Sequence, residues 1–445
     1  MKSKGIFVSL MVLVVVAFFS LSAGAQDFAI VRYLNQETDP AVVAVQRGWV
    51  ERFVEKYPNI DIILEGAPNT VINQKIATYV QAGAPLDVIH SDGGSAARLA
   101  AEGLLVPLCD VVEALGGRET FPPGRLLIYD DVVYAINQAP ANPVLHYRKD
   151  LFEEAGLEPP ATWDELLHAA QTLHSDEIAG IALPGGENRA TTIYSGIFLW
   201  QNAGQFFDED LNVTIDNELT HEALAFYAQL LEYSPPDAAG WAFTEPIESF
   251  FAGRSAMVNY WHGLDLTWRA NPDMIPKIGV VSMPMGKMRV TEQGGRFVCV
   301  YAGSENPEAS KKWVEFIFSD ENSIDITEIQ PMLYPPPTYT AIENLRASQA
   351  PNIQAYGQYL FDVVYPEAEY AYNQIFHAGG INAETLEMEE TWIMNPLVSV
   401  LWNSNLYARA VQRVAYDDWT PEEAAAECQR ELEAQVEVAR AEMGL

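Results

Sequence analysis

Two short polar segments of this chain hold the kinds of side chain that bind a ligand through hydrogen bonds: amides, carboxylates, a hydroxyl and an imidazole. Their residues are Asn35, Gln36 and Glu37 in the first segment and His90, Ser91 and Asp92 in the second. Each segment lies at the end of an apolar stretch, over residues 28–34 and 86–90, that predicts a buried strand. Other roles stay open, because ordinary turns use the same residues and Ser91 or Asp92 could cap a following helix.

No group of residues has the spacing of a known metal or nucleophile motif. The seven histidines and three cysteines include no HExxH pair and no paired Cys/His ligands. The chain also has no GxSxG string, no P-loop and no GxGxxG after a predicted strand. We therefore expect no metal, no cofactor and no catalytic residue. A secreted carbohydrate-active enzyme stays an alternative, because geometry rather than sequence defines the carboxylate pair of a glycosidase and the chain has 61 acidic residues.

The elements that must position the two polar segments alternate between strand and helix. After the first strand, apolar residues recur every three or four positions over residues 42–57, which predicts one face of a helix. A strand over residues 60–64 and a helix over 71–81 follow before the second polar segment. This order predicts an α/β lobe with a largely parallel sheet. Ligands bind such sheets at the carboxyl ends of the strands, where both polar segments are expected.

A second α/β region is predicted to begin near Val144. Thr162 and Glu165 have the spacing of a capping box, which marks the start of a helix. Segments rich in proline or glycine are the natural candidates for crossings between two lobes, and they lie at residues 138–143, 283–286 and 331–337.

Length and charge narrow the class of protein. A chain of 445 residues with 49% hydrophobic residues is expected to form two lobes rather than one core. Lysine and arginine number 26 against 61 acidic residues, for a net charge of −35. We therefore expect no nucleic-acid partner, because binding to polyanions needs basic surfaces.

The first 25 residues predict a secretory signal peptide. Lys2 and Lys4 precede an apolar run over residues 6–21, and Ala23-Gly24-Ala25 offers a cleavage site. The mature protein is expected to be soluble in the periplasm or otherwise outside the cytoplasm. In such an oxidising compartment its three cysteines, Cys109, Cys299 and Cys428, could form at most one disulfide within the chain, or could all be small buried side chains.

Several collinear segments are similar to the extracellular solute-binding proteins of ABC importers, in the large sugar-binding family that includes maltose-binding protein. Residues 145–166 resemble the family's "lyYNkdlfekaGl-pPkTWdEl" segment, although Arg148 replaces the usual Asn. Residues 101–108, 250–257 and 420–424 resemble its "a-G-l-l-p-L", "F-aGraAM" and "s-p-eeA" elements. The resemblance covers nearly the whole mature chain in the right order.

The resemblance implies a two-lobed periplasmic-binding-protein fold, type II-like, with a ligand cleft between lobes joined by a multi-segment hinge. The expected division is a signal peptide over residues 1–25, an N-terminal lobe of 26–142 plus 285–335, and a C-terminal lobe of 143–284 plus 336–445. The implied function is that of a monomeric binding protein, not an enzyme, which captures a sugar or oligosaccharide and delivers it to the transmembrane subunits of an ABC permease.

The resemblance also implies site residues in addition to the two polar segments. They are the sugar-stacking candidates Trp261, Tyr194 and Trp402, and the polar or weaker candidates Asn202, Arg296 and Tyr147. Aromatic rings cover the CH faces of a sugar, whereas amides and carboxylates pair with its hydroxyls. Packing in a strand edge or in a core is the alternative role of Trp261 and Trp402. A glycerol phosphodiester ligand is a further alternative, but it would need basic residues that this chain supplies sparsely.

Residues 350–394 are rich in Tyr and Glu and match the family poorly. They could be an insertion that shapes the cleft or one that caps a lobe.

Overall fold

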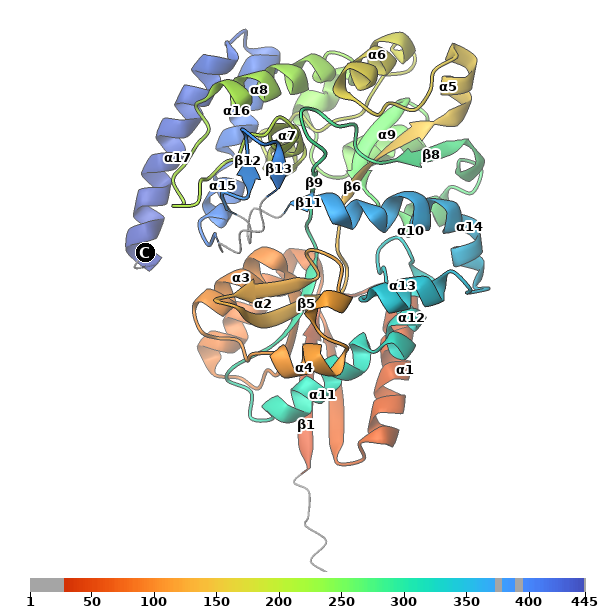
Figure 1. The fold of residues 1–445 in the computed structure, drawn as a ribbon, viewed down its shortest axis with the longest axis vertical. Coiled ribbons are helices and arrows are strands. Elements are labelled where there is room, and N and C mark those ends of the chain that lie inside the picture. The colour runs from red at the N-terminus through yellow and green to blue at the C-terminus, as the bar shows by residue number, and fades with distance from the viewer. Residues whose placement is uncertain (1–27, 373–377, 389–394, 444–445) are drawn as a thin grey trace, which may run out of the picture.

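A computed structural model describes residues 28–372, 378–388 and 395–443. They form two lobes, one above the other in Figure 1, and the chain passes between the lobes several times. This confirms the two-lobed α/β fold. The predicted signal peptide lies outside the described residues.

The first lobe is built around a six-stranded sheet in the order β2-β1-β3-β10-β5-β4. In that order the strands are Ile60–Gly66, Ala29–Asn35, Val88–Asp92, Arg296–Val300, Val132–Asn137 and Leu126–Tyr129. Strands β2, β1 and β3 are parallel, whereas β10, β5 and β4 pair antiparallel. The prediction of a largely parallel sheet was therefore wrong for half of it, because β10 returns from the other lobe and β4 and β5 are joined by a tight hairpin.

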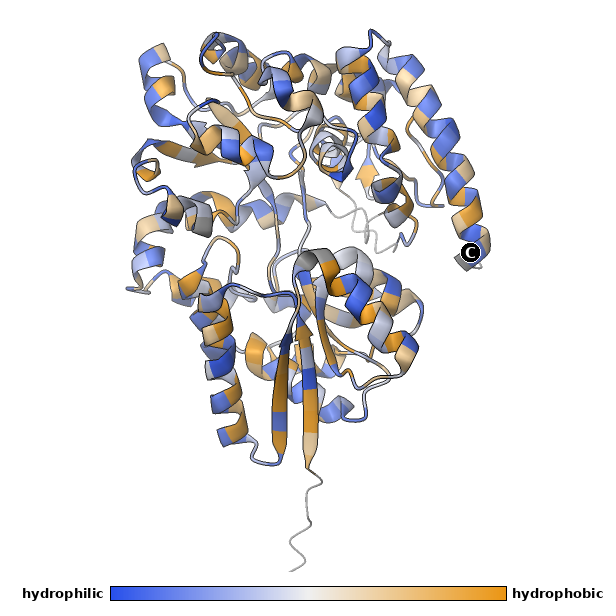
Figure 2. Cartoon of the chain, turned by 180° about the vertical axis from the view of Figure 1, so that it is seen from behind, coloured by the Kyte–Doolittle hydropathy of each residue, from blue (hydrophilic) through white to orange (hydrophobic). Residues whose placement is uncertain are grey.

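Helices on both sides of this sheet bury apolar stripes against it. They are α1 (Pro40–Lys56), α2 (Asn69–Ala82), α3 (Gly93–Ala101), α4 (Cys109–Ala114), α11 (Pro307–Phe318) and α12 (Asp320–Ile329). On α1 the apolar period places Val42, Trp49 and Phe53 fully inside. Figure 2 shows the result, with orange strands inside and helices that are orange and blue on different faces.

The second lobe has a three-stranded antiparallel sheet, β7-β6-β8, covered by helices. The strands are Met257–Trp261, Pro143–Arg148 and Ile278–Val281. The helices are α5 (Lys149–Ala155), α6 (Trp163–Leu173), α7 (Arg189–Gln201), α8 (Glu218–Leu231), α9 (Glu245–Phe251), α10 (Asp265–Ala270), α14 (Pro351–Tyr359), α15 (Val398–Ser404), α16 (Leu406–Tyr416) and α17 (Pro421–Met443). Thr162 and Glu165 form the predicted capping box at the start of α6.

Two crossings between the lobes run side by side. One joins β5 to β6 through residues 138–142, and the other joins β9 (Thr291–Glu292) to β10 through residues 293–295. The two are hydrogen bonded to each other between Ala141 and Gly294. Gly295 has φ +151°, and a Cβ there would lie 2.3 Å from the Asn137 amide, so only glycine fits this passage.

The predicted crossing at residues 283–286 belongs instead to the second lobe. Met285 exchanges backbone hydrogen bonds with Ala161 and Trp163, and Met288 donates to Gln201. Because these partners are in the second lobe, we propose that its boundary lies near residue 293 rather than 285. The other predicted boundaries remain predictions.

The segment after α12 also differs from a simple crossing. Residues 331–337 turn beside the first lobe, and α13 (Tyr339–Leu345) then packs on α12 before the chain continues into α14. Of the poorly matched residues 350–394, those described form α14, two irregular helical turns, β11 (Ala371–Tyr372), which pairs with β9, and the short pair β12 (Ile381–Asn382) and β13 (Glu387–Met388). Residues 373–377 and 389–394 lie outside the described part.

Cys109, Cys299 and Cys428 are all free thiols in this structure. Cys299 and Cys428 are buried, whereas Cys109 is half-buried.

Candidate functional site

The topology of the first lobe brings its two polar segments together. Strands β1 and β3 are parallel neighbours, so their carboxyl ends reach the same edge of the sheet. Strand β10 runs the other way and begins at this edge, where Arg296 pairs in register with Asp92. The edge faces the second lobe (Figure 1). Strand order therefore brings Glu37, His90, Asp92 and Arg296 together at the edge of the sheet that faces the second lobe.

Glu37 and Arg296 form the charged centre of this edge. Arg296 Nη1 lies 2.6 Å from Glu37 Oε1 and also donates to the Tyr334 hydroxyl at 3.3 Å. Burial by itself raises the pKa of Glu37, but the Arg296 guanidinium, together with His90 and the Tyr334 hydroxyl, outweighs it and the pKa is lowered. Burial lowers the pKa of His90 to about 4, so this ring is neutral at pH 7 even with its Nδ1 3.9 Å from Glu37.

Of the remaining residues of the two segments, Asn35 and Asp92 form local hydrogen bonds, whereas the buried Gln36 amide nitrogen has no hydrogen-bond partner among the described residues. Asn35 accepts the Glu37 amide at 3.0 Å, which is the turn role that the sequence left open. Gln36 and Ser91 are buried. Asp92 caps α3 by accepting the Ser95 amide at 3.1 Å, and it also accepts from Asn73 at 2.6 Å. Asp92 is thus a helix cap that remains half-exposed.

Two substitutions of Asp92 separate its capping role from a ligand role. Asp92→Ala is expected to lower the free energy of unfolding by about 1 kcal/mol, because α3 loses its cap, whereas Asp92→Asn keeps a capping oxygen and should cost little. Urea unfolding of both variants measures the difference. Equal stability of the two would contradict the capping role, and a loss of ligand affinity in Asp92→Asn alone would add a ligand role.

In the second lobe, Trp261 lies at the end of β7 as part of an aromatic cluster. Phe243 stacks on its indole with ring centroids 5.3 Å apart and planes at 21°, and Tyr194 lies 5.5 Å away. The Trp261 indole nitrogen donates to Glu292 Oε2 at 3.5 Å. Trp261 is half-buried, whereas Tyr194 is fully buried behind it. The indole is therefore held rigidly at the cleft edge of the sheet.

Glu292 is the main residue that the sequence analysis missed. It is 6% exposed, and burial raises its pKa to about 7. Its carboxylate accepts the long hydrogen bond from Trp261, and the Arg189 guanidinium and a backbone hydrogen bond from Gly294 offset only part of the effect of burial on its pKa. Its position directly before the Gln293-Gly294-Gly295 crossing was the available signal, because a residue beside an interlobe crossing must lie near the cleft.

Trp402 reaches across to the first lobe. It lies on α15, and a Cβ added to Gly94 of α3 would be 3.4 Å from its indole ring. Arg189, at the start of α7, places its guanidinium carbon 4.7 Å from the Trp402 ring centroid. The two lobes thus approach each other closely at Gly94 and Trp402.

Two predicted residues lie away from this cleft edge. The Asn202 side chain donates to the Leu219 carbonyl and to Glu222, which fastens the end of α7 to α8. Tyr147 pairs with Met257 at the opposite end of the β6–β7 ladder from Trp261. The antiparallel register explains this, because it places Pro143, four residues before Tyr147, beside Trp261.

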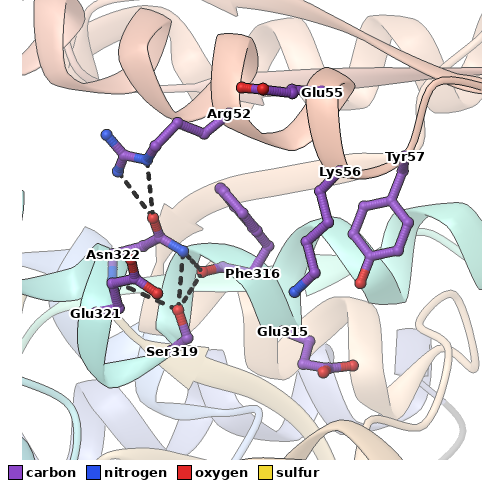
Figure 3. A pocket seen from close by; sticks show the side chains of 9 residues that line it. All are labelled: Arg52, Glu55, Lys56, Tyr57, Glu315, Phe316, Ser319, Glu321 and Asn322. Carbon is purple, nitrogen blue, oxygen red and sulfur yellow. Dashed lines mark hydrogen bonds between the residues drawn. The ribbon is translucent and has the colours of Figure 1, made fainter.

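Two hollows elsewhere do not contain the predicted residues. One, of about 390 Å³, lies on the first lobe between α1 and α11–α12, where Arg52 donates to Asn322 (Figure 3). The other, of about 590 Å³, is lined by Phe121, Leu126, Tyr372 and other residues of both lobes. Within the described ranges, no cluster of three or more His, Cys, Asp or Glu side chains could hold a metal ion. No helix among these residues is long and apolar enough to cross a membrane.

Comparison with known proteins gives relatives of one kind. An uncharacterized ABC transporter extracellular-binding protein of Pyrococcus horikoshii is 25% identical over 287 residues, which is 60% of this chain and 63% of that protein. A mannitol-binding protein of Pseudomonas aeruginosa is 27% identical over 248 residues, 53% of this chain and 55% of the relative. Each match therefore spans less than two thirds of the relative's length.

A solved structure has the same fold. The ABC transporter solute-binding protein of Thermotoga lettingae, bound to alpha-D-tagatose, superposes with a TM-score of 0.71 at 23% identity, over 92% of this chain and 99% of that one. Residues 37–324 also match the family model described as bacterial extracellular solute-binding protein. This match covers more than half of the sequence, and the fold agrees with it. The chain therefore belongs to the bacterial extracellular solute-binding protein family.

Proposed function

We propose that this protein captures a neutral sugar or polyol in the cleft between its lobes and delivers it to an ABC permease. The observation that carries the proposal is the pairing of Trp261 with Glu292. A fixed indole offers a surface for the CH face of a sugar, and the carboxylate at its edge accepts hydroxyl hydrogens. The mannitol-binding relative and the tagatose-bound structural neighbour support this class of ligand.

The charges of the cleft favour a neutral ligand over a phosphodiester. Arg296 is already paired with Glu37 at 2.6 Å, and Arg189 lies over the Trp402 ring. Glu292 is a buried carboxylate that would repel an anion placed on Trp261. A glycerol phosphodiester would therefore meet the Glu292 acid, whereas the Arg296 guanidinium is already paired with Glu37 and the Arg189 guanidinium lies over the Trp402 ring in the field of Glu292.

The function is conformational rather than chemical in this proposal. A ligand that contacts Trp261 of one lobe and the Glu37–Arg296 pair of the other stabilises the closed form, which the permease then recognises. The protein acts as a monomer outside the cytoplasm, after cleavage near Ala25, and needs no cofactor or nucleic acid. Both the family and the relatives are binding proteins, which supports binding rather than catalysis.

Thermal unfolding of the ligand-stripped mature protein tests the proposal. The panel holds D-mannitol, tagatose, maltose, longer oligosaccharides and glycerol phosphates. A ligand at one hundred times its Kd should add about 2.7 kcal/mol of stability. We expect a shift with one neutral class and recovery of that compound intact.

Three other outcomes would contradict the proposal. Recovery of cleaved product would indicate the carbohydrate-active enzyme. A shift with glycerol phosphate alone would indicate the phosphodiester ligand. If no compound shifts the unfolding temperature, the family and the fold would stand but the proposed ligand class would be wrong.

A further inference from the structure

The two lobes approach each other closely at one end of the cleft edge. A Cβ added to Gly94 of α3 would be 3.4 Å from Cζ3 of the Trp402 indole on α15, which lies above α3 in Figure 1. A carbon–carbon bond is about 1.5 Å long, so the Gly94 Cα lies within about 5 Å of this indole. A sugar ring between two surfaces needs a contact of about 3.5–4.0 Å on each face, which sets those surfaces about 7 Å apart. The space between Gly94 and Trp402 is therefore too narrow for a sugar unit.

The Trp402 indole is also largely enclosed. Trp402 is 8% exposed and belongs to the same buried apolar cluster as Val398 and Leu401 of α15. The Arg189 guanidinium carbon lies 4.7 Å from the ring centroid and covers one face of the ring. The half-buried indole of Trp261, in contrast, keeps part of its surface accessible. Trp402 thus offers a ligand less aromatic surface than Trp261 does.

The carboxylate beside this close approach is already hydrogen bonded. Asp92 Oδ1 lies 3.2 Å from the Cβ that would be added to Gly94. This oxygen accepts the Ser95 amide at 3.1 Å, and Asp92 Oδ2 accepts from Asn73 at 2.6 Å. A ligand hydroxyl at this end of the cleft edge would therefore compete with existing hydrogen bonds.

Polar groups with more capacity for a ligand lie beside Trp261 and in the first polar segment. The Glu292 carboxylate accepts a long bond of 3.5 Å from the Trp261 indole nitrogen. The buried Gln36 amide nitrogen, next to Glu37, has no hydrogen-bond partner among the described residues. A buried donor without a partner costs stability, which a ligand oxygen can restore. These groups favour a ligand that lies near Trp261 and Glu37.

Trp402 nevertheless borders the same site. Burial raises the pKa of Glu292 to about 7, and the Arg189 guanidinium over the Trp402 ring opposes part of this rise. Arg189 is therefore near enough to act on both Trp402 and Glu292. The narrow passage at Gly94 and Trp402 consequently adjoins the Trp261–Glu292 pair.

We propose that Trp402 and Gly94 close one end of the cleft and limit the ligand to a single sugar ring or an open-chain polyol. This inference rests on the proposed function, because it states the length of the ligand that Trp261 and Glu292 bind. In this role Trp402 is an end wall of the site, not the stacking surface that the family resemblance implies.

Isothermal titration with ligands that differ only in length tests the proposal. The probes are pairs in which the longer member carries one additional glucosyl unit: D-glucose and maltose, D-sorbitol and maltitol, and D-mannitol and glucosylmannitol. For the pair that binds, we expect the unaltered protein to bind the shorter member at least about tenfold more tightly. Trp402→Ala should reduce this ratio at least about fivefold, because the volume of the indole becomes available to the second unit.

Two further variants keep the comparison sound. Trp402→Phe retains an aromatic ring beside Arg189 but removes the Cζ3 atom that faces Gly94, so it should also reduce the ratio if Trp402→Ala does not fold. Trp419→Ala is the matched control, because Trp419 is a half-buried tryptophan that packs against Arg413. It should leave the ratio unchanged.

Three results would overturn the end wall while the proposed function stands. They are equal or tighter binding of the longer member by the unaltered protein, a ratio that neither Trp402 variant changes, and a loss of affinity in Trp402→Ala that is confined to the longer member. The last result would identify Trp402 as a stacking surface. If no compound of either length binds, the proposed function fails, and the end wall fails with it.

Discussion

Replacing Trp261 by Ala is expected to weaken ligand binding by at least about 1 kcal/mol, or about fivefold in Kd. The indole is fixed from behind by Phe243 at 5.3 Å and at its edge by Glu292 at 3.5 Å, so its contact with a sugar needs no further ordering. Isothermal titration with the sugar that gives the largest thermal shift measures the loss.

Two further variants show where the loss comes from. Trp261→Phe keeps an aromatic face but removes the N–H that bonds Glu292, and it should lose less affinity than Trp261→Ala. Trp419→Ala is the matched control, because Trp419 is also half-buried but packs against Arg413, 4.0 Å from its ring. Unchanged affinity in Trp261→Ala, or an equal loss in Trp419→Ala, would remove Trp261 from the site.

Much of the fold could be predicted because its signals are local. The apolar period of α1, the cap at Thr162 and the strand–helix alternation each depend on neighbouring residues. The antiparallel half of the first sheet could not be predicted in this way, since β10 joins β3 only after a return from the second lobe. Residues 283–286 were predicted to cross between the lobes for a similar reason. Proline and glycine indicate a turn, but they do not indicate which lobe surrounds it.

The site residues also fall into two groups: those that local signals or the family resemblance predict, and those whose position depends on tertiary packing. The rule for strand ends places Glu37 and Asp92 at the cleft edge, and the family resemblance supplies Trp261 and Arg296. Neither source indicates that Asn202 faces α8, because that depends on which side of α7 is covered. Glu292 was missed because its one local signal, the position directly before an interlobe crossing, does not by itself distinguish it from the many other acidic residues. Its distinguishing property is burial beside Trp261, which depends on the tertiary contact between the end of β7 and β9.

Replacing Glu292 by Gln is expected to stabilise the ligand-free protein at pH 8. Burial raises the pKa of Glu292 to about 7, so the folded state holds its proton more tightly than the unfolded state does. Its contribution to stability therefore falls as pH rises from about 4.5 to 7 and is level above 7. Gln keeps the shape without the charge, and the gain at pH 8 should reach up to about 3 kcal/mol and nearly vanish at pH 4.5. Urea unfolding at the two pH values measures it.

The same variant should bind ligand more weakly. A gain in stability together with a loss of affinity is the combination expected of a carboxylate that binds ligand. A sugar hydroxyl donates more strongly to a charged acceptor, so Glu292→Gln should lose about 1–2 kcal/mol of affinity at pH 8. Glu248→Gln is the matched control, because Glu248 is an exposed acid of the same lobe and should change neither quantity. If Glu292→Gln were less stable at pH 8 and bound ligand as well as the unaltered chain, Glu292 would serve only to hold Trp261. The buried charge of Glu292 lowers the stability of the ligand-free protein at pH 8. A ligand whose hydroxyls donate to this carboxylate offsets that cost, so the same residue that destabilises the free protein strengthens binding.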